Sequence, residues 1–155
     1  QLADFSLTYH PYEAGGDMIY ETKRIRMIPG THFYEMTSVV KTESGKDAVL
    51  AVGLTDFGQA SVVKDSSKSM LMLDEYISEK DGNIGGAVFV PSDAFAGYAE
   101  YGKDRLILVN VHSGEPVTCY VGTGWSHDTR FDPYKSKWPN MIRKTTYETL
   151  FKSYN

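Results

Sequence analysis

Aromatic, histidine and carboxylate side chains recur where the strands of this chain are expected to end or turn. They lie in four short stretches: Tyr9-His10-Pro11-Tyr12, Glu35, Glu75-Tyr76 and Trp125-Ser126-His127-Asp128. Histidine and carboxylate groups transfer protons near neutral pH, and aromatic rings stack on the faces of sugars. The pattern predicts that His10, His127 and Glu35 are catalytic residues of a sugar site. Tyr9 and Trp125 are predicted to bind the sugar by stacking.

The stretch 17–28 is predicted to form a long strand with polar groups on both faces. Alternation puts Tyr20, Thr22, Arg24 and Arg26 on one face and Ile19, Glu21, Lys23, Ile25 and Met27 on the other. One interpretation is a solvated face whose ion pairs add little stability. The other is that Arg24 or Arg26 binds a carboxylate, because a planar guanidinium donates two parallel hydrogen bonds to that group. In that case Glu21 and Arg24 bind the substrate, which could carry a uronic acid.

Several other kinds of chemistry lack the residue pattern that they need. The histidines are far apart in the chain: His10, His32, His112 and His127. With a single cysteine, Cys119, this spacing predicts no metal site. Gly122-Thr123-Gly124 lacks the third glycine and the following helix of a phosphate loop. Ser126-His127-Asp128 is consecutive, whereas catalytic triads assemble from separate segments. No metal and no other cofactor is predicted.

Composition predicts one globular domain. Of the 155 residues, 41% are apolar and 23% are charged. The net charge is -4, and the 16 basic residues are scattered among 20 acidic ones. No basic surface for nucleic acid is therefore expected. No stretch approaches the roughly 18 apolar residues of a membrane span.

Short apolar runs separated by Gly, Pro, Asn and Asp predict an all-β protein. Strands are expected near residues 3–10, 17–28, 32–42, 47–54, 58–64, 69–78, 85–91, 104–111 and 116–123. The run Leu106–Val111 is apolar on both faces, so a layer must cover each side of it. We therefore expect an antiparallel β-sandwich. Cys119 lies between Val117 and Val121 and is expected to be a buried apolar residue.

Only the C-terminal segment has a helical pattern. A helix over 137–153 is predicted, with Ser136 as its N-cap and Pro139 in its first turn. Its apolar residues form two stripes: Trp138, Met141 and Ile142, and then Tyr147, Leu150, Phe151 and Tyr154. At about 100° per residue these stripes are roughly opposite. Either the helix breaks near Thr145-Thr146 or it packs between two bodies.

The chain begins inside an apolar alternation formed by Phe5, Leu7 and Tyr9. A strand that opens at residue 3 or 4 has backbone donors and acceptors that need a neighbour. We therefore expect residues 1–155 to be a single β-sandwich domain that forms the C-terminal portion of a larger one. The expected protein partner is the N-terminal portion of the same protein, either missing or present as a separate chain.

Several segments together resemble domain of unknown function 4861, a family known from bacterial polysaccharide-degradation gene clusters. The matching segments are Phe5–Tyr9, Glu21–Thr31, Gly82–Val88, Tyr120–Ser126 and the terminal helix with Trp138. The resemblance spans almost the whole chain and implies half of a galactose-mutarotase-like supersandwich with a carbohydrate-related role. It also implies export to the bacterial periplasm or cell surface. The acid/base residues of true mutarotases have no matching motif here and are not carried over.

Three functions remain open at this point. The first is a carbohydrate-active protein, a lyase, hydrolase or epimerase, that acts on an oligosaccharide or a uronic-acid-containing glycan. The second is a non-catalytic glycan-binding module, for which aromatic platforms suffice. The third is a structural half-domain that completes the sheet of a partner chain. Because one fold supports many reactions, the fold does not choose among them.

Overall fold

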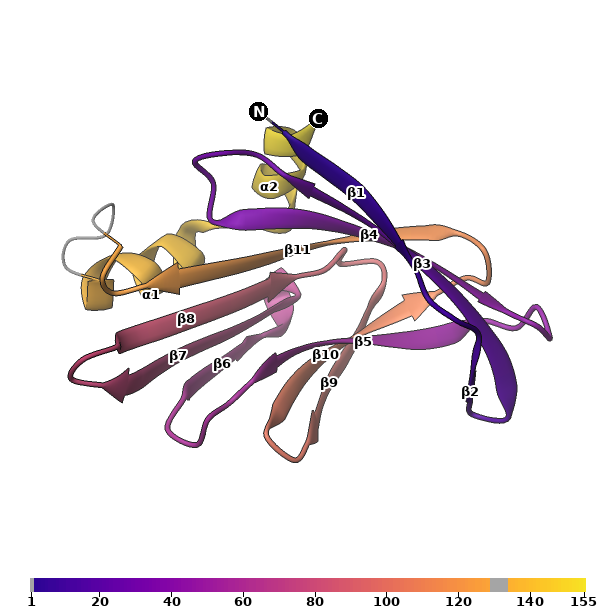
Figure 1. The fold of residues 1–155 in the computed structure, drawn as a ribbon, viewed down its shortest axis with the longest axis horizontal. Helices are drawn as coiled ribbons and strands as arrows, with labels where there is room; N and C mark the ends of the chain where they lie inside the picture. Colours follow the sequence, from indigo (N-terminus) through magenta and orange to yellow (C-terminus); the bar gives the residue numbers. More distant parts are fainter. Residues whose placement is uncertain (1, 129–133) are drawn as a thin grey trace.

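A computed structural model describes residues 2–128 and 134–155 as two antiparallel sheets followed by two helices (Figure 1). The strands are β1 (Ala3–Thr8), β2 (Tyr12–Ala14), β3 (Asp17–Met27), β4 (Phe33–Thr42), β5 (Ala48–Thr55), β6 (Ser61–Asp65), β7 (Met70–Ser78), β8 (Gly82–Phe89), β9 (Phe95–Tyr101), β10 (Asp104–Val111) and β11 (Pro116–Trp125). A 3₁₀ turn spans Ser66–Lys68, and the helices are α1 (Tyr134–Lys144) and α2 (Tyr147–Tyr154). The all-β sandwich with a helical C-terminus is thereby confirmed.

The larger sheet has eight strands in the order β1-β3-β4-β11-β8-β7-β6, and β2 pairs with β3 at the β1 edge. The smaller sheet has the order β5-β10-β9. β5 packs over β8 and β10 over β7, while Lys64 on β6 bonds Glu100 on β9 at 2.9 Å. The smaller sheet therefore faces mainly the β8-β7-β6 half of the larger one. β5 is a free edge of the smaller sheet. It lies on the side on which the larger sheet continues beyond β8 through β11, β4 and β3 to β1.

The sequence pattern does not predict β2 and β9. β2 lies in a segment where Pro11 and Gly16 indicate a turn, and its three residues are exposed. β9 contains Gly97 at a φ of +119°, and its register against β10 shifts between Leu108 and Val109. Glycine and alanine are weak strand formers, so pairing with β10 rather than local propensity determines β9.

Two apolar cores lie on the two faces of the larger sheet. The inner core, between the sheets, includes Ile25, Met36, Leu71, Val88, Ile107, Val109 and Cys119. The outer core, beneath the helices, includes Phe33, Met70, Phe89, Tyr120, Trp138, Ile142 and Tyr154. In Figure 1 the helices lie alongside β11 and β4, away from the smaller sheet. Both faces of the central strands of the larger sheet are therefore covered. The outcome differs for Leu106–Val111, which forms most of β10, the middle strand of the smaller sheet. Its residues Ile107, Val109 and Val111 face the inner core, whereas Leu106 and Leu108 on the other face are only partly buried, so the expected layer on each side of this run is not found among the described residues.

The C-terminal segment forms two helices because it breaks at Thr145-Thr146. Thr146 caps α2, and its side chain and that of Thr149 bond each other's backbone N–H groups in a capping box. The break turns both apolar stripes toward the same outer core, which confirms the first of the two alternatives. α1 begins at Tyr134, so Ser136 lies inside the helix and does not cap it. In the described part of the chain, no helix is long and apolar enough to cross a membrane.

Candidate functional site

Tyr9, Tyr12, Glu21 and Lys23 form a compact group beside β3, here named the tyrosine–glutamate cluster. The Tyr12 hydroxyl donates to Oε2 of Glu21 at 3.3 Å. Nζ of Lys23 lies 3.2 Å from the other carboxylate oxygen of Glu21 and 4.9 Å from the centre of the Tyr9 ring. The backbone holds the group together, because the Tyr9 N–H donates to the Glu21 carbonyl at 3.0 Å. Two predicted binding residues, Tyr9 and Glu21, are thereby close together.

Burial and charge give the members of this cluster different roles. Glu21 is buried, whereas Tyr9 and Tyr12 are 41% and 42% exposed. Burial alone would lower the pKa of Lys23, but attraction to Glu21 and bonds to Glu21 and Tyr9 raise it above its ordinary value. Burial, followed by the charge of Glu21, raises the pKa of Tyr12. At neutral pH the cluster therefore presents an ammonium and a phenol, both fixed by a buried carboxylate, beside two exposed rings.

A groove of about 370 Å³ begins at Tyr12 and runs between the two sheets. Its walls are formed by β2, the start of β3, the end of β4 and the start of β5, including Asp17, Ile19, Thr42, Lys46 and Leu50. The groove offers a concave surface beside Tyr12, the one member of the cluster that lines it. Apolar walls with a few fixed polar groups are typical of small-ligand sites.

Arg24 lies on the opposite face of β3 from the cluster. Its Nε and Nη2 donate to the two carboxylate oxygens of Asp4 at 2.8 and 2.5 Å. These bonds, followed by the charge of Asp4, raise the pKa of Arg24. The guanidinium that the sequence predicts to bind a substrate carboxylate is thus paired within the chain. His10 is exposed and lies between β1 and β2.

Glu35 is buried on the outer face of the larger sheet. It accepts hydrogen bonds from Nη1 of Arg26 at 2.9 Å and from the Tyr120 hydroxyl at 3.2 Å. Nη2 of Arg26 in turn donates to the Tyr154 carbonyl at 3.0 Å. Burial, followed by the charge of Glu35, raises the pKa of Tyr120. Glu35 therefore helps to attach the end of α2 to β3 and β4.

Trp125 and His127 lie at the far end of β11. Their ring centres are 4.9 Å apart, and Nε1 of Trp125 donates to the Asp81 carbonyl at 2.7 Å. Trp125 is 48% exposed, as a stacking residue must be. His10, Glu35 and His127 thus come from a loop beside β2, the outer face of β4 and the end of β11. The structure does not gather these three predicted catalytic residues into one place. Among the described residues, no three His, Cys, Asp or Glu side chains form a group that could hold a metal ion.

The sequence pattern of one protein family, Domain of unknown function (DUF4861), matches residues 2–151. The chain belongs to this family. Among curated proteins, none matches the chain. The DUF4861 match covers both sheets and most of the helical segment, so every site residue predicted from the sequence lies within the family's domain.

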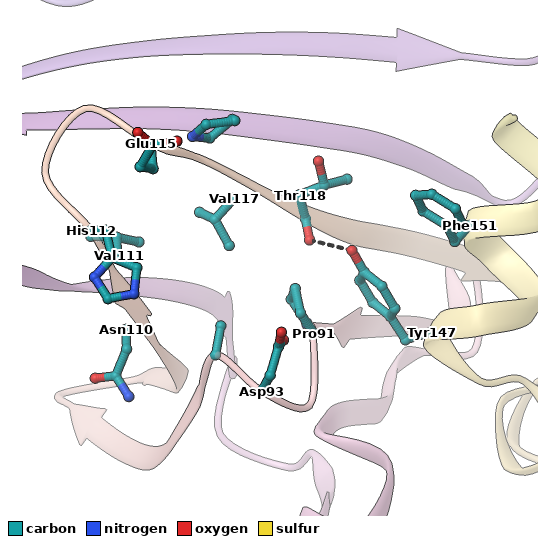
Figure 2. Close-up of a pocket in the computed structure, with 12 residues that line it drawn as sticks. Pro91, Asp93, Asn110, Val111, His112, Glu115, Val117, Thr118, Tyr147 and Phe151 are labelled. Carbon is teal, nitrogen blue, oxygen red and sulfur yellow. Dashed lines mark hydrogen bonds between the residues drawn. The ribbon is translucent and has the colours of Figure 1, made fainter.

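The DUF4861 domain also has a pocket of about 340 Å³ that the sequence pattern does not predict (Figure 2). It lies between the 91–94 loop, the 112–116 turn and α2, and Asp93 and Tyr147 both point toward β11. β11 pairs with β8 only from Tyr120 onward, and the Tyr147 hydroxyl donates to the Thr118 carbonyl beyond that point at 3.0 Å. Burial is the main cause that raises the pKa of Tyr147 to about 12. The Tyr147 hydroxyl thus replaces the hydrogen-bond donor that β8 would supply to Thr118 if the two strands paired this far.

Proposed function

We propose that this domain binds carbohydrate at the tyrosine–glutamate cluster, as part of bacterial polysaccharide degradation in the periplasm or at the cell surface. The observation that carries the proposal is the pair of exposed rings, Tyr9 and Tyr12, beside the buried Glu21 and its partner Lys23. The rings stack on a sugar face, while the Lys23 ammonium donates to a hydroxyl or a uronate oxygen. Glu21 holds Lys23 and Tyr12 in place. The ligand is an oligosaccharide or a uronic-acid-containing glycan.

Binding without catalysis fits the geometry better than turnover. Glycoside cleavage requires an acid and a base on either side of one bond, about 5 to 9.5 Å apart. The cluster contains a single carboxylate, Glu21, and the predicted acid/base residues lie elsewhere on the chain. Trp125, the other predicted stacking residue, lies at the far end of β11 and would contact a different part of a long ligand.

Titration of the domain with neutral and uronic-acid-containing oligosaccharides tests the proposal. Tyr9→Ala removes one stacking surface and should weaken binding about tenfold, which corresponds to about 1.4 kcal/mol. Lys23→Met should weaken binding of the uronic-acid-containing set more than that of the neutral set. Tyr20→Ala is the matched control, because Tyr20 is 41% exposed on the opposite face of β3. Equal affinities for the Tyr9 and Tyr20 variants would contradict the proposal.

A second function is favoured by the free edges of the two sheets. Among the described residues, β1 and β5 each pair with one strand only. On β1 the apolar residues Phe5 and Leu7 are exposed, as is Met27 opposite β1. An uncovered apolar row beside a free strand edge is suited to strand addition. On this proposal the domain is a structural half that is completed by strands of a partner, with the N-terminal portion of the same protein as the expected one.

Mass spectrometry and light scattering of the protein from its native source test the second function. The expected result is a particle heavier than this chain alone, in which Phe5 and Leu7 resist labelling by hydroxyl radicals. A stable monomer of this chain with labelled Phe5 would contradict it. The two functions can be separated, because a partner over β1 would also cover Tyr9 and reduce glycan binding there.

A further inference from the structure

The loop that joins β5 to β6 is held by two buried carboxylates. Each backbone N–H from Phe57 to Ala60 donates to one of them: Phe57 and Gln59 to Glu75, both at 2.9 Å, and Gly58 and Ala60 to Asp56, at 2.6 and 3.4 Å. Arg105 fixes Asp56 in turn, through Nε at 3.2 Å and Nη2 at 2.8 Å. Four consecutive N–H groups on two buried carboxylates make this loop rigid.

The side chain that this loop presents is apolar and faces solvent. Phe57 is 66% exposed, although Glu75 and Asp56 beneath it are each only 5% exposed. Burying carboxylates opposes folding, and an exposed phenylalanine returns little stability. Fixing the backbone that carries an aromatic ring does, however, remove part of the entropy cost of binding. The arrangement therefore points to a ligand contact at Phe57 rather than to stability.

Phe57 borders a groove of about 240 Å³ that is also lined by Gln59, Glu75, Tyr76, Ile77 and Ile84. Trp125 pairs with Ile84 across β11 and β8, and Ile84 pairs with Glu75 across β8 and β7. Directly paired residues share a face of a sheet, so Trp125 and Glu75 lie on the same face. They are two strands apart, which puts their backbone positions about 10 Å from each other. The strand positions of Trp125 and Glu75 thus lie on either side of Ile84 at a spacing comparable to the length of a disaccharide, and Glu75 holds the loop that carries Phe57.

The size and polarity of this surface favour a sugar chain over a protein partner. The exposed parts of Phe57, Tyr76, Ile77, Ile84 and Trp125 together amount to roughly 500 Å². A standard protein interface uses about 800 Å² from each partner. In the described part of the chain, the Tyr76 hydroxyl and the Gln59 side-chain amide have no hydrogen-bond partner, so both can bond sugar hydroxyls. Among the residues that line the groove, only Glu75 is charged. Both of its carboxylate oxygens already accept hydrogen bonds from the loop, so this surface does not call for a charged ligand.

We infer that Phe57 and Trp125 are the two stacking residues of a second carbohydrate contact, which binds a flat, neutral oligosaccharide across Ile84. The inference rests on the proposed glycan-binding function and adds a separate contact at the opposite end of the larger sheet from the tyrosine–glutamate cluster. Tyr76 and Gln59 supply hydrogen bonds at the rim. Glu75 is a positioning residue, since it touches the loop and not the ligand.

Tryptophan fluorescence provides a direct readout of this contact. Trp125 is 48% exposed and Trp138 is fully buried, so ligand-dependent changes report mainly on Trp125. The probes are neutral β-linked disaccharides and hexasaccharides of glucose, mannose, xylose and galactose, titrated into the whole chain. Phe57→Ala should weaken binding of the best hexasaccharide about tenfold and change disaccharide affinity much less. Phe57→Trp, titrated by calorimetry because it adds a second exposed fluorophore, should bind the hexasaccharide about as tightly as the wild type.

Phe151→Ala is the matched control, because Phe151 is 48% exposed on α2, away from this groove. The variants are compared by isothermal titration calorimetry, because Trp125→Ala lacks the fluorescent reporter. If Phe57→Ala and Trp125→Ala bind every hexasaccharide as the wild type does, the second contact is wrong, and a loss in Tyr9→Ala alone then leaves the cluster standing. If the Phe57 and Trp125 variants lose affinity while Tyr9→Ala does not, the second contact stands and the cluster is wrong. Absence of binding by the wild type overturns both.

Discussion

Arg26 and Glu35 are paired directly across β3 and β4, and their side chains meet at 2.9 Å beneath the last turn of α2. Arg24 is two residues away on the same face of β3 and pairs with Asp4 in solvent. The chain thus holds a buried and an exposed arginine–carboxylate pair side by side. Only the buried pair also bonds a helix, through the Tyr154 carbonyl.

Glu35→Gln should therefore destabilise the fold by about 3 kcal/mol, because it leaves the Arg26 charge partly buried without a counter-ion. Urea unfolding followed by far-UV circular dichroism measures the loss. Arg24→Gln is the control and should leave the urea midpoint unchanged, since exposed pairs add little. A Glu35 variant as stable as the wild type would show that the buried pair does not hold α2.

Gly124 allows Trp138 of α1 to pack against β11. A Cβ at position 124 would lie 2.4 Å from Cε3 of Trp138, closer than side chains tolerate. Gly124→Ala should cost about 2 kcal/mol and alter the near-UV circular dichroism of Trp138. In Gly86→Ala the new Cβ meets methyl groups of Leu54 at 3.1 Å, which can move, so a smaller loss is expected. Equal losses would contradict this account of the helix packing.

Acid stability should depend on Asp56. Hydrogen bonds from Arg105, followed by that from the Gly58 N–H, hold the pKa of Asp56 below its ordinary value. The folded chain therefore binds this proton more weakly than the unfolded chain does. The stabilisation is complete above the ordinary aspartate pKa, about 3.9, and is lost as the pH falls through the lowered value. Melting temperatures between pH 7 and pH 2 should fall less steeply for Asp56→Asn than for the wild type, and parallel curves would refute this.

Cys119 should be unreactive in the folded chain. It is buried in the inner core, and burial raises its pKa to about 12, so almost no thiolate forms near neutral pH. A chromogenic thiol reagent at pH 8 should label the native chain only as fast as it unfolds, and label it at once in urea. Rapid labelling without denaturant would show that the two sheets open near β11.

Local chemistry made the all-β class, most strands and the helical tail predictable from the sequence. Strand alternation and turn residues act over a few neighbours, so the pattern alone indicates β3, β4 and β10. β2 and β9 could not be predicted this way, because Gly97 and the turn residues around β2 are poor strand formers that only a paired neighbour holds extended. The sequence pattern left two alternatives for the C-terminal segment, one of them a break at Thr145-Thr146. Only the packing of both apolar stripes against the outer core decides between them.

For the sites, the sequence by itself determined which residues share a face of β3, and hence that Glu21 and Lys23 lie opposite Arg24. Residue types also indicated Tyr9 and Trp125 as exposed rings. Only the tertiary structure decided that Arg24 is paired with Asp4, that Glu35 lies beneath α2, and that two carboxylates hold Phe57. The physical reason is that these contacts join strands far apart in the chain, and strand pairing and helix packing set their register. No local periodicity encodes them.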